Sequence, residues 1–508
     1  MTPHVTFPPE GFGKDTKMES FDVVIVGAGL SGIGAAWHLQ DKCNGKSFTI
    51  LEAREAIGGT WDLFRYPGIR SDSDMFTLGY NFRPWTEQKA IADGPHILKY
   101  VRETAQESGI DRHIRFRHKV TQASFDSTTG RWTVTADTPE GQRTFTCRML
   151  LMAAGYYSYD NPHNPHFEGE ERFGGRMFHA QLWPDDVDTR NKRVVVIGSG
   201  ATAVTIVPVV ARDAAHVTML QRSPTWMISR PAEDRFANLL RRILPPMMAY
   251  NIVRWRNVLW QNLVFKQSRT NPAKVNRHMT DMLLKELPED VVKAHFQPSY
   301  NVWDQRLCLV PDSDFFKAVK DGSASVVTDH VDHFDEKGIV LKSGQRLDAD
   351  IVVKATGLRL QVLGGARVMV DGQEVRPNDR YVYRGMMLEG VPNLVYVFGY
   401  FNASWTLRAD LTCEWACRLL RALDNPATPI AVPERKVEVT DEPLLLNSGY
   451  VQRAMDTLPR QSGTDPWRDT QDYLKDRQSI HQDPLADGTL QFRPLSPARA
   501  RPLAQAAE

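Results

Sequence analysis

Short apolar runs alternate with amphipathic stretches near the start of the chain. The run FDVVIVG at 21–27 predicts a buried strand, and residues 30–40 predict a helix with Ala35 and Ala36 on its inner side. SFTILEAR at 47–54 predicts the next strand. This order is typical of a β-α-β unit in a parallel sheet.

The same order returns later in the chain. KRVVVIG at 192–198 and HVTMLQR at 216–222 predict the strands of a second β-α-β unit. The pattern predicts an α/β fold with two Rossmann-like dinucleotide-binding domains and a helical insertion. Further strands returning to a sheet are expected at 113–120, 123–137, 143–155 and 326–357.

The stretch 235–277 differs in its pattern, which is helical and broken at Pro245–Pro246. It carries nine Lys or Arg and no Asp or Glu. One interpretation is a helical insertion packed over the mouth of an active site. The other is peripheral contact with an anionic membrane surface, at the inner face of the membrane. The aromatic residues of this stretch include Phe236, Trp255, Trp260 and Phe265.

A chain of 508 residues has the length of roughly three domains of about 150 residues each. We expect the chain to pass twice through each dinucleotide-binding domain and to end in segments without a fixed structure. The expected divisions are a flexible arm at 1–20, a first domain at 21–160 and 361–485, a second domain at 161–228 and 303–360, the helical insertion at 229–302 and a disordered tail at 486–508.

Composition and charge narrow the class of protein. Lys plus Arg number 62 against 61 for Asp plus Glu, so no nucleic-acid partner is indicated. No signal peptide and no apolar run of about 18 residues is present, which argues against secretion and a membrane span. The cysteines form no C-x-x-C pair or metal-ligand cluster, which favours a reducing cytoplasm and no metal site. They are Cys43, Cys147, Cys308, Cys413 and Cys417.

The first β-α-β unit contains the fingerprint GAGLSG. Gly27 permits the tight turn, Gly29 lets the backbone approach a pyrophosphate, and Gly32 allows close packing of helix and strand. Glu52, at the end of the next strand, can accept hydrogen bonds from a ribose. Together with Gly58-Gly59-Thr60-Trp61, typical of flavoproteins, these features indicate an FAD site.

The second unit contains GSGATA at 198–203, with Ala203 in place of the third glycine. An NAD site would have a carboxylate at the end of the following strand, whereas this chain has Arg222 and Ser223. The planar guanidinium suits a 2′-phosphate, so NADPH is favoured over NADH. The alternative is that Arg222 simply faces solvent.

The stretch FGGRMFHAQLWPDD at 173–186 has the spacing F-x-G-x-x-x-H-x-x-x-W, and it resembles the signature of flavoprotein Baeyer–Villiger monooxygenases. The resemblance extends over about 20–470 and includes RYPGIRSDSD at 65–74, YNVWDQRLCLVPD at 300–312 and NASWTLRADL at 402–411. It implies an enzyme in which NADPH reduces FAD and molecular oxygen forms a flavin peroxide. That peroxide would convert hydrophobic, aliphatic ketones to esters and sulfides or thioamides to sulfoxides.

The resemblance also implies roles for particular residues. Arg306 falls at the position of the family's catalytic arginine, a permanent cation beside the flavin and the substrate oxygen. Asp72 falls at the position of the acid that pairs with this arginine. His179 and Asp350 belong to linker motifs with a conformational role. Relatives often carry a lysine where this chain has Gln305, so the 2′-phosphate is expected to depend more on Arg222 and Ser223, with a weaker preference over NADH.

The candidate cofactor-binding residues fall into two groups, one around each fingerprint. The first group comprises Gly27, Gly29, Ser31, Gly32, Glu52, Thr60, Trp61, Asp62, Leu63, Arg70, Ser71, Asp72 and Val120. The second comprises Ser199, Gly200, Ala201, Thr202, Ala203, Val204, Thr205, Arg222 and Ser223.

Two alternative functions remain open at this point. One is an N- or S-oxygenating flavin monooxygenase, whose signature usually ends in Phe or Tyr where this chain has Trp183. The other is a non-catalytic sensor that binds NADPH and FAD. A disulfide reductase is excluded, because neither Cys43 nor Cys147 has a nearby partner in the sequence.

Overall fold

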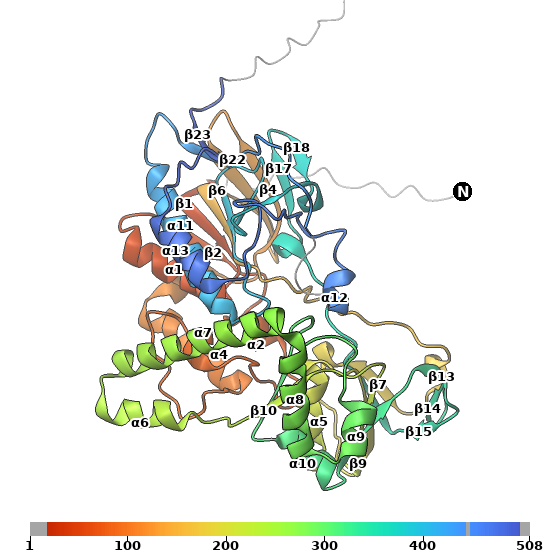
Figure 1. The fold of residues 1–508 in the computed structure, drawn as a ribbon. Helices are drawn as coiled ribbons and strands as arrows, with labels where there is room; N and C mark the ends of the chain where they lie inside the picture. The colour runs from red at the N-terminus through yellow and green to blue at the C-terminus, as the bar shows by residue number, and fades with distance from the viewer. Residues whose placement is uncertain (1–17, 443–447, 498–508) are drawn as a thin grey trace, which may run out of the picture.

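The structure, a computed structural model, describes residues 18–442 and 448–497 (Figure 1). The parts of the predicted arm and tail at 1–17 and 498–508 lie outside the described residues. Two sheets dominate. A nine-stranded sheet has the order β18-β17-β4-β5-β6-β1-β2-β3, with β21 also paired to β6, and a five-stranded sheet has the order β12-β9-β8-β16-β7.

Segments distant in sequence build each sheet. The strands of the nine-stranded sheet are β1 Glu19–Val26, β2 Phe48–Leu51, β3 Ile114–Arg115, β4 Lys119–Asp126, β5 Arg131–Thr138, β6 Gly141–Met152, β17 Arg367–Val370, β18 Gln373–Val375 and β21 Leu394–Tyr396. Those of the five-stranded sheet are β7 Arg176–His179, β8 Arg193–Ile197, β9 His216–Gln221, β12 Ala324–Thr328 and β16 Ile351–Lys354.

Helices and small sheets complete the fold. The α-helices are α1 Leu30–Lys42, α2 Thr60–Leu63, α3 Met75–Leu78, α4 Gly94–Glu107, α5 Ala201–Val210, α6 Arg235–Ile243, α7 Pro246–Thr270, α8 Pro272–Glu286, α9 Glu289–His295, α10 Asp314–Lys320, α11 Trp405–Ala422, α12 Gly449–Gln452 and α13 Tyr473–Gln482. The remaining strands are β10 Met227–Arg230, β11 Cys308–Pro311, β13 Val331–Asp335, β14 Gly338–Leu341, β15 Arg346–Asp348, β19 Val382–Tyr383, β20 Met387–Leu388, β22 Ile430–Pro433 and β23 Leu490–Arg493. The 3-10 turns are η1 Ile110–His113, η2 Glu170–Arg172, η3 Ala180–Leu182, η4 Val362–Gly365 and η5 Pro377–Asp379.

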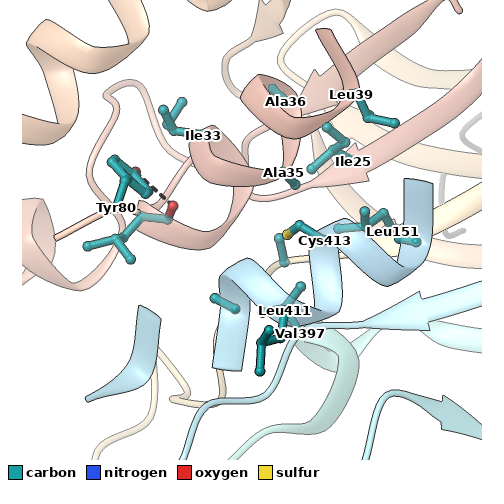
Figure 2. Close-up of a cluster of buried hydrophobic side chains, with 14 of the residues drawn as sticks. Ile25, Ile33, Ala35, Ala36, Leu39, Tyr80, Leu151, Val397, Leu411 and Cys413 are labelled. Atoms are coloured by element: carbon teal, nitrogen blue, oxygen red, sulfur yellow. Dashed lines mark hydrogen bonds between the residues drawn. The ribbon is translucent and has the colours of Figure 1, made fainter. Parts of the chain in front are cut away.

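Both predicted β-α-β units are confirmed. In the first, β1 lies between β2 and β6 and pairs parallel with both. Helix α1 packs against α11, and Figure 2 shows Ala35 of α1 on the side toward Cys413 of α11, in one buried cluster with Ala36 and Leu411. Small side chains at this position let two helices approach closely. In the second unit, β8 pairs parallel with β9.

Two strand predictions need correction. The run 113–120 is not one strand, because Arg117 has a φ of 58° and separates β3 from β4. Within 326–357 only β12 and β16 join the five-stranded sheet, while β13, β14 and β15 form an antiparallel sheet of their own. Short turns between those three strands allow local pairing, which the apolar pattern alone does not distinguish from return to a larger sheet. A turn at 127–130 joins the antiparallel strands β4 and β5.

The start of the predicted disordered tail is structured. Strand β23 pairs antiparallel with β22, and Ile430 faces Arg493 in this pair. The polar composition of 486–508 suggested disorder, but Leu490 is buried and anchors the segment. At the other end, β1 already begins within the predicted arm.

The helical stretch breaks at Pro245–Pro246 as predicted, with Pro246 as the first residue of α7. A second break, at Asn271, separates α7 from α8. Helix α7 is anchored by Arg254, which is 5% exposed. Its guanidinium donates to the carbonyl oxygens of Phe76 and Gly79, both at 2.8 Å, and pairs with Asp410 at 3.4 Å. Among the helices of 18–442 and 448–497, we find none with the length and apolar character needed to cross a bilayer.

Candidate active site

The first nucleotide loop joins β1 to α1 without room for larger side chains. A Cβ atom added to Gly32 would lie 1.8 Å from the carbonyl oxygen of Gly27. Helix α1 begins at Leu30 with no side-chain cap, so its first amides are available to an anion. Glu52 approaches the same loop, and its Oε2 accepts a hydrogen bond of 2.6 Å from the amide of Ala28. Burial raises the pKa of the Glu52 carboxyl.

A second segment packs against this loop. A Cβ atom on Gly59 would lie 3.1 Å from the Cα atom of Gly29, so the two backbones are nearly in contact. Thr60, Trp61, Asp62 and Leu63 form α2 directly after it. The carboxylate of Asp62 is engaged by Arg54 at 2.6 Å and by Arg102 at 2.9 Å. The structure therefore brings this segment to the loop, but the Asp62 side chain already holds two cations.

The other residues of the first group are more dispersed. Ser31 lies in α1, and the indole Nε1 of Trp405 donates to its hydroxyl at 2.7 Å. Val120 is buried in β4. Arg70 forms an ion pair with Asp314, so its guanidinium is directed to α10.

The second nucleotide loop joins β8 to α5. Gly200 precedes α5, which also begins without a side-chain cap. Ala203 is 1% exposed, so this loop accommodates a methyl group where the first requires glycine. The hydroxyl of Ser199 donates to the carbonyl oxygen of Ser223 at 3.2 Å, which joins the loop to the end of β9. The rest of this group, Ala201, Thr202, Val204 and Thr205, lies in the first half of α5.

Three arginines gather beside the second loop. Arg222 is exposed after β9. The pKa of Arg453 is lowered by burial and by the neighbouring charges of Arg222 and Arg359. In the described parts of the chain, none of the three has an ion-pair partner. The sequence indicated only Arg222, because the other two approach it from distant segments.

A cavity of about 700 Å³ has both Asp72 and Arg306 on its wall. The polar residues around it include Ser73, Asp74 and Arg230. Most of the lining is apolar: Ile91, Ile228, Trp260, Leu263, Val264, Val275, Met279, Met282, Val302, Trp303, Leu307, Leu309, Phe401 and Ala403. The cavity can hold a hydrophobic molecule with one polar end facing Arg306.

The surroundings of Arg306 keep it cationic. Tyr156 is the largest influence that raises its pKa, and Tyr450, Tyr157 and Asp72 act in the same direction against burial. Among the described residues its buried Nε–H has no hydrogen-bond acceptor. Burial raises the pKa of Asp72, while Arg306 partly opposes that shift. The Nε–H of Arg306 is available to a bound molecule, because no protein group in the described residues accepts from it.

Two loops hold this pair against the second nucleotide unit. Asp72 follows Gly68, whose φ is +76°; a Cβ atom there would lie 2.6 Å from Val209 in α5. Arg306 precedes β11, where the thiol of Cys308 donates to the carbonyl oxygen of Ser199 at 3.9 Å. Ser71 fixes the first loop locally, since its hydroxyl accepts from the amide of Ser73 at 2.9 Å.

Sequence reasoning missed the tyrosines near Arg306. Tyr156 and Tyr157 follow the end of β6, and their hydroxyls lie 2.7 Å apart. Burial raises the pKa of Tyr157 to about 12, so it stays neutral. Their place after a buried parallel strand was a usable signal, because ligands bind at the carboxyl ends of such strands. Tyr450 is distant in sequence and had no such signal.

The linker signature does not line the cavity. His179 is buried at the end of β7, where its Nδ1 accepts from the amide of Gln181 at 3.1 Å. Burial lowers its pKa to about 4, so the imidazole is neutral. A Cβ atom on Gly175 would lie 2.5 Å from the carbonyl oxygen of Asp350. The two predicted linker motifs are therefore in contact.

Comparison with known families places the chain among flavin enzymes. The profile of the family described as "Flavin-binding monooxygenase-like" matches residues 80–362, and that of "NAD(P)-binding Rossmann-like domain" matches 25–91. The FAD-containing monooxygenase EthA of Mycobacterium tuberculosis is 51% identical over 478 residues, which cover 93% of this chain and 98% of EthA. The putative FAD-containing monooxygenase MymA of the same organism is 46% identical over 486 residues, covering 93% and 98%.

Solved structures share the fold. An oxidized steroid monooxygenase bound to NADP is similar with a TM-score of 0.76 and 24% identity, over 94% of this chain and 100% of that chain. Cyclohexanone monooxygenase from Rhodococcus sp. Phi1 bound to NADP+ is similar with a TM-score of 0.74 and 18% identity, over 94% and 100%. At these identities the likeness concerns the arrangement of the two dinucleotide-binding sheets.

Proposed function

Because the chain belongs to the flavin-binding monooxygenase-like family and is an FAD-containing, NADPH-dependent monooxygenase, we propose that it carries out Baeyer–Villiger oxidation of hydrophobic ketones. A ketone, molecular oxygen, NADPH and a proton would give an ester, water and NADP+. The observation that carries this proposal is the cationic Arg306 with an unengaged Nε–H on the wall of a largely apolar cavity.

The residues of the first loop fit FAD. The uncapped start of α1 suits its pyrophosphate, and the buried Glu52 suits a ribose hydroxyl. When bound, FAD supplies hydride acceptance and activation of oxygen. We propose that 21–160 and 361–485 form its domain.

The second loop fits NADPH. The start of α5 suits the pyrophosphate, and Arg222 with Arg359 and Arg453 suits the 2′-phosphate, since three unpaired cations favour a dianion. The two additional arginines offset the replacement of lysine by Gln305. We propose that 161–228 and 303–360 form this domain, and that the 229–302 insertion covers the cavity.

Arg306 would polarise the substrate carbonyl. Its guanidinium can donate a hydrogen bond to the ketone oxygen as negative charge develops there, in a cavity where apolar walls strengthen that interaction. Asp72 would orient the guanidinium and balance its charge. Tyr156 and Tyr157, both neutral, would neighbour the guanidinium without competing for the proton.

The cavity supports hydrophobic substrates of some length. Trp260, Leu263 and Val264 of α7 line it. Trp405 is not on the wall, although the neighbouring Ala403 is. We propose aliphatic ketones as the main substrates and sulfides or thioamides as further ones. A reducing cytoplasm is the proposed location, which suits five free cysteines.

The test is product analysis with labelled oxygen gas. The purified yellow protein receives NADPH and 2-decanone, and mass spectrometry follows the products. We expect an ester that carries one labelled oxygen atom. NADPH consumption that yields only hydrogen peroxide would contradict the ketone assignment. If a parallel reaction with an amine in place of 2-decanone then gave a labelled N-oxygenated product, that result would favour the N-oxygenating alternative. A protein that consumes neither NADPH nor oxygen would be a sensor.

A further inference from the structure

Exposed apolar side chains are concentrated on the helical insertion. Of the fifteen large hydrophobic side chains exposed in the described residues, ten lie on α6, α7 and α8. Isolated apolar residues are normal on a protein surface, but a concentration of this kind marks an interaction site. Figure 1 shows α6 and α7 at one edge of the molecule, where they also contact each other.

The exposed side chains follow helical spacing. On α6 they are Phe236, Leu239 and Ile243, with exposed fractions of 45%, 56% and 68%. On α7 the stripe comprises Met248, Ile252, Trp255, Leu259 and Leu263, and Trp260 is exposed beside it. Spacings of three and four residues place each set along one side of its helix. Helix α7 also has a buried side, which contains Val253, Arg254 and Val258, so the exposed stripe is additional to its packing face. We call the two exposed stripes together the α6–α7 face.

The charge around this face has one sign. The stretch 235–277 contains nine Lys or Arg and no acidic residue. Arg235 and Arg242 are exposed beside the apolar stripe of α6, and within the described parts of the chain neither has an ion-pair partner. Long basic side chains can reach lipid headgroups while apolar neighbours enter the acyl boundary. This complementarity favours an anionic lipid surface over a second copy of the chain, whose own face would repel it.

The α6–α7 face adjoins the candidate active site. Trp260 and Leu263 are 52% and 50% exposed, and both also line the cavity that contains Arg306. One side of α7 thus connects the surface with the interior. Lys274 of α8 and His278 stand at the same cavity wall.

We propose that the α6–α7 face docks on an anionic membrane surface and that hydrophobic substrate enters the cavity from the lipid, between α7 and α8. The docking stands on the described surface alone, whereas the entry route rests on the proposed function. A long-chain ketone partitions into lipid, so its concentration would be higher at an entrance that faces the membrane than at one that faces water.

The test of docking is cosedimentation of the full-length protein with vesicles. We expect binding to vesicles of phosphatidylcholine with phosphatidylglycerol, weaker binding to phosphatidylcholine alone, and release by salt. The double variant Leu239→Ser with Ile243→Ser should bind roughly tenfold or more weakly. Arg235→Gln with Arg242→Gln should weaken binding to the anionic vesicles roughly thirtyfold and leave neutral vesicles unaffected.

Matched controls come from exposed residues outside the insertion. Val437→Ser and Leu495→Ser remove apolar side chains that are 67% and 44% exposed, and neither should change vesicle binding. Sedimentation equilibrium of each protein checks its oligomeric state. A wild-type dimer that the α6 variants convert to monomer, with no vesicle binding, would assign the face to a second copy and overturn the proposal. Equal binding of all variants would overturn it as well.

The entry route has a separate readout. Wild type and the α6 variant should oxidise a short, water-soluble ketone at equal rates, whereas vesicles should lower the apparent KM for 2-decanone only in the wild type. Docking without this difference would overturn the entry route alone. Absence of any ketone oxidation would count against the proposed function and leave the docking result intact.

Discussion

The two nucleotide loops have the same shape but different surroundings. In the first, Gly32 leaves no space for a methyl group, and the acidic Glu52 is 4% exposed and bonded to the loop. In the second, Ala203 supplies that methyl group, and the cationic Arg222 is exposed and unpaired among the described residues. The first loop is the more buried of the two, since Ala28 is buried whereas Gly200 of the second loop is exposed.

This difference matches two kinds of cofactor use. The more buried site suits a molecule that stays bound through many turnovers, as FAD would. An exposed site with charged side chains suits one that arrives and leaves, as NADPH would, because exposed charges steer association and release. Substitutions in and between the two loops test this difference.

The largest effect is expected from Gly32→Ala. Its Cβ atom would lie 1.8 Å from a backbone oxygen, so the loop must distort and FAD binding should be lost completely. The flavin absorbance of the purified protein measures this. Gly200→Ala is the matched control, since nothing lies within 4 Å of its added Cβ atom. Equal flavin content in the two variants would contradict the contrast between the loops.

Arg306→Ala should leave the binding of both cofactors unchanged and abolish oxidation of the substrate. We expect ester formation to fall by roughly 1,000-fold or more, because the developing charge on the substrate loses its donor. Rapid mixing with NADPH without oxygen should still show reduction of the flavin. The Arg306→Lys variant keeps the charge but not the planar donor, and it should recover little activity. Ester formation at a normal rate in Arg306→Ala would remove Arg306 from the mechanism, and a normal rate in Arg306→Lys would show that the charge alone is sufficient.

Arg222→Ala should act on the exposed loop only. A charged hydrogen bond of about 1.5–3 kcal/mol corresponds to a rise in the KM for NADPH of roughly 10- to 100-fold. The KM for NADH should hardly change, since NADH has no 2′-phosphate. Steady-state kinetics with both coenzymes provides the measurement. Arg453→Gln should have the same sign and a smaller size, and equal effects on NADH would argue against a phosphate site.

The smallest effect concerns His179 and pH. Burial lowers its pKa from 6.5 to about 4, so the unfolded chain binds more protons between these values. Stability is therefore fully present above pH 6.5 and is lost as the pH falls toward 4, by at most about 3 kcal/mol. The melting temperature of wild type should drop more between pH 7.5 and about 5 than that of His179→Asn. Parallel drops in the two proteins would mean that other groups dominate acid sensitivity.

Local patterns predicted the nucleotide units well. Strand β1, helix α1 and strand β2 follow from apolar runs and glycine spacing, both of which act within a few residues. The run 113–120 misled because a positive φ at Arg117 leaves no mark in the apolar pattern. The separate sheet of β13, β14 and β15 was missed for a related reason, since register and partner choice depend on tertiary packing.

The residues of the candidate site also fall into two groups, those that local motifs predicted and those that distant segments contribute. Asp72 and Arg306 were found through their motifs, and the structure places both on one cavity wall. The ion pair of Arg70 with Asp314 was not predicted, because the two residues lie 244 positions apart in the sequence. Arg453 and Tyr450 reach the site from a segment near the end of the chain. Such encounters depend on the path of the whole chain and not on any local spacing.

The buried anchor at Arg254 limits how the active site can open. Its guanidinium is fastened to the carbonyl oxygens of Phe76 and Gly79 and to the carboxylate of Asp410. Moving this part of α7 outward would leave the buried carboxylate of Asp410 without the Arg254 cation, at a cost of several kcal/mol. We therefore expect the segment of α7 around Arg254 to stay in place when the cavity opens. Movement is expected at the C-terminal end of α7, where Asn271 separates it from α8.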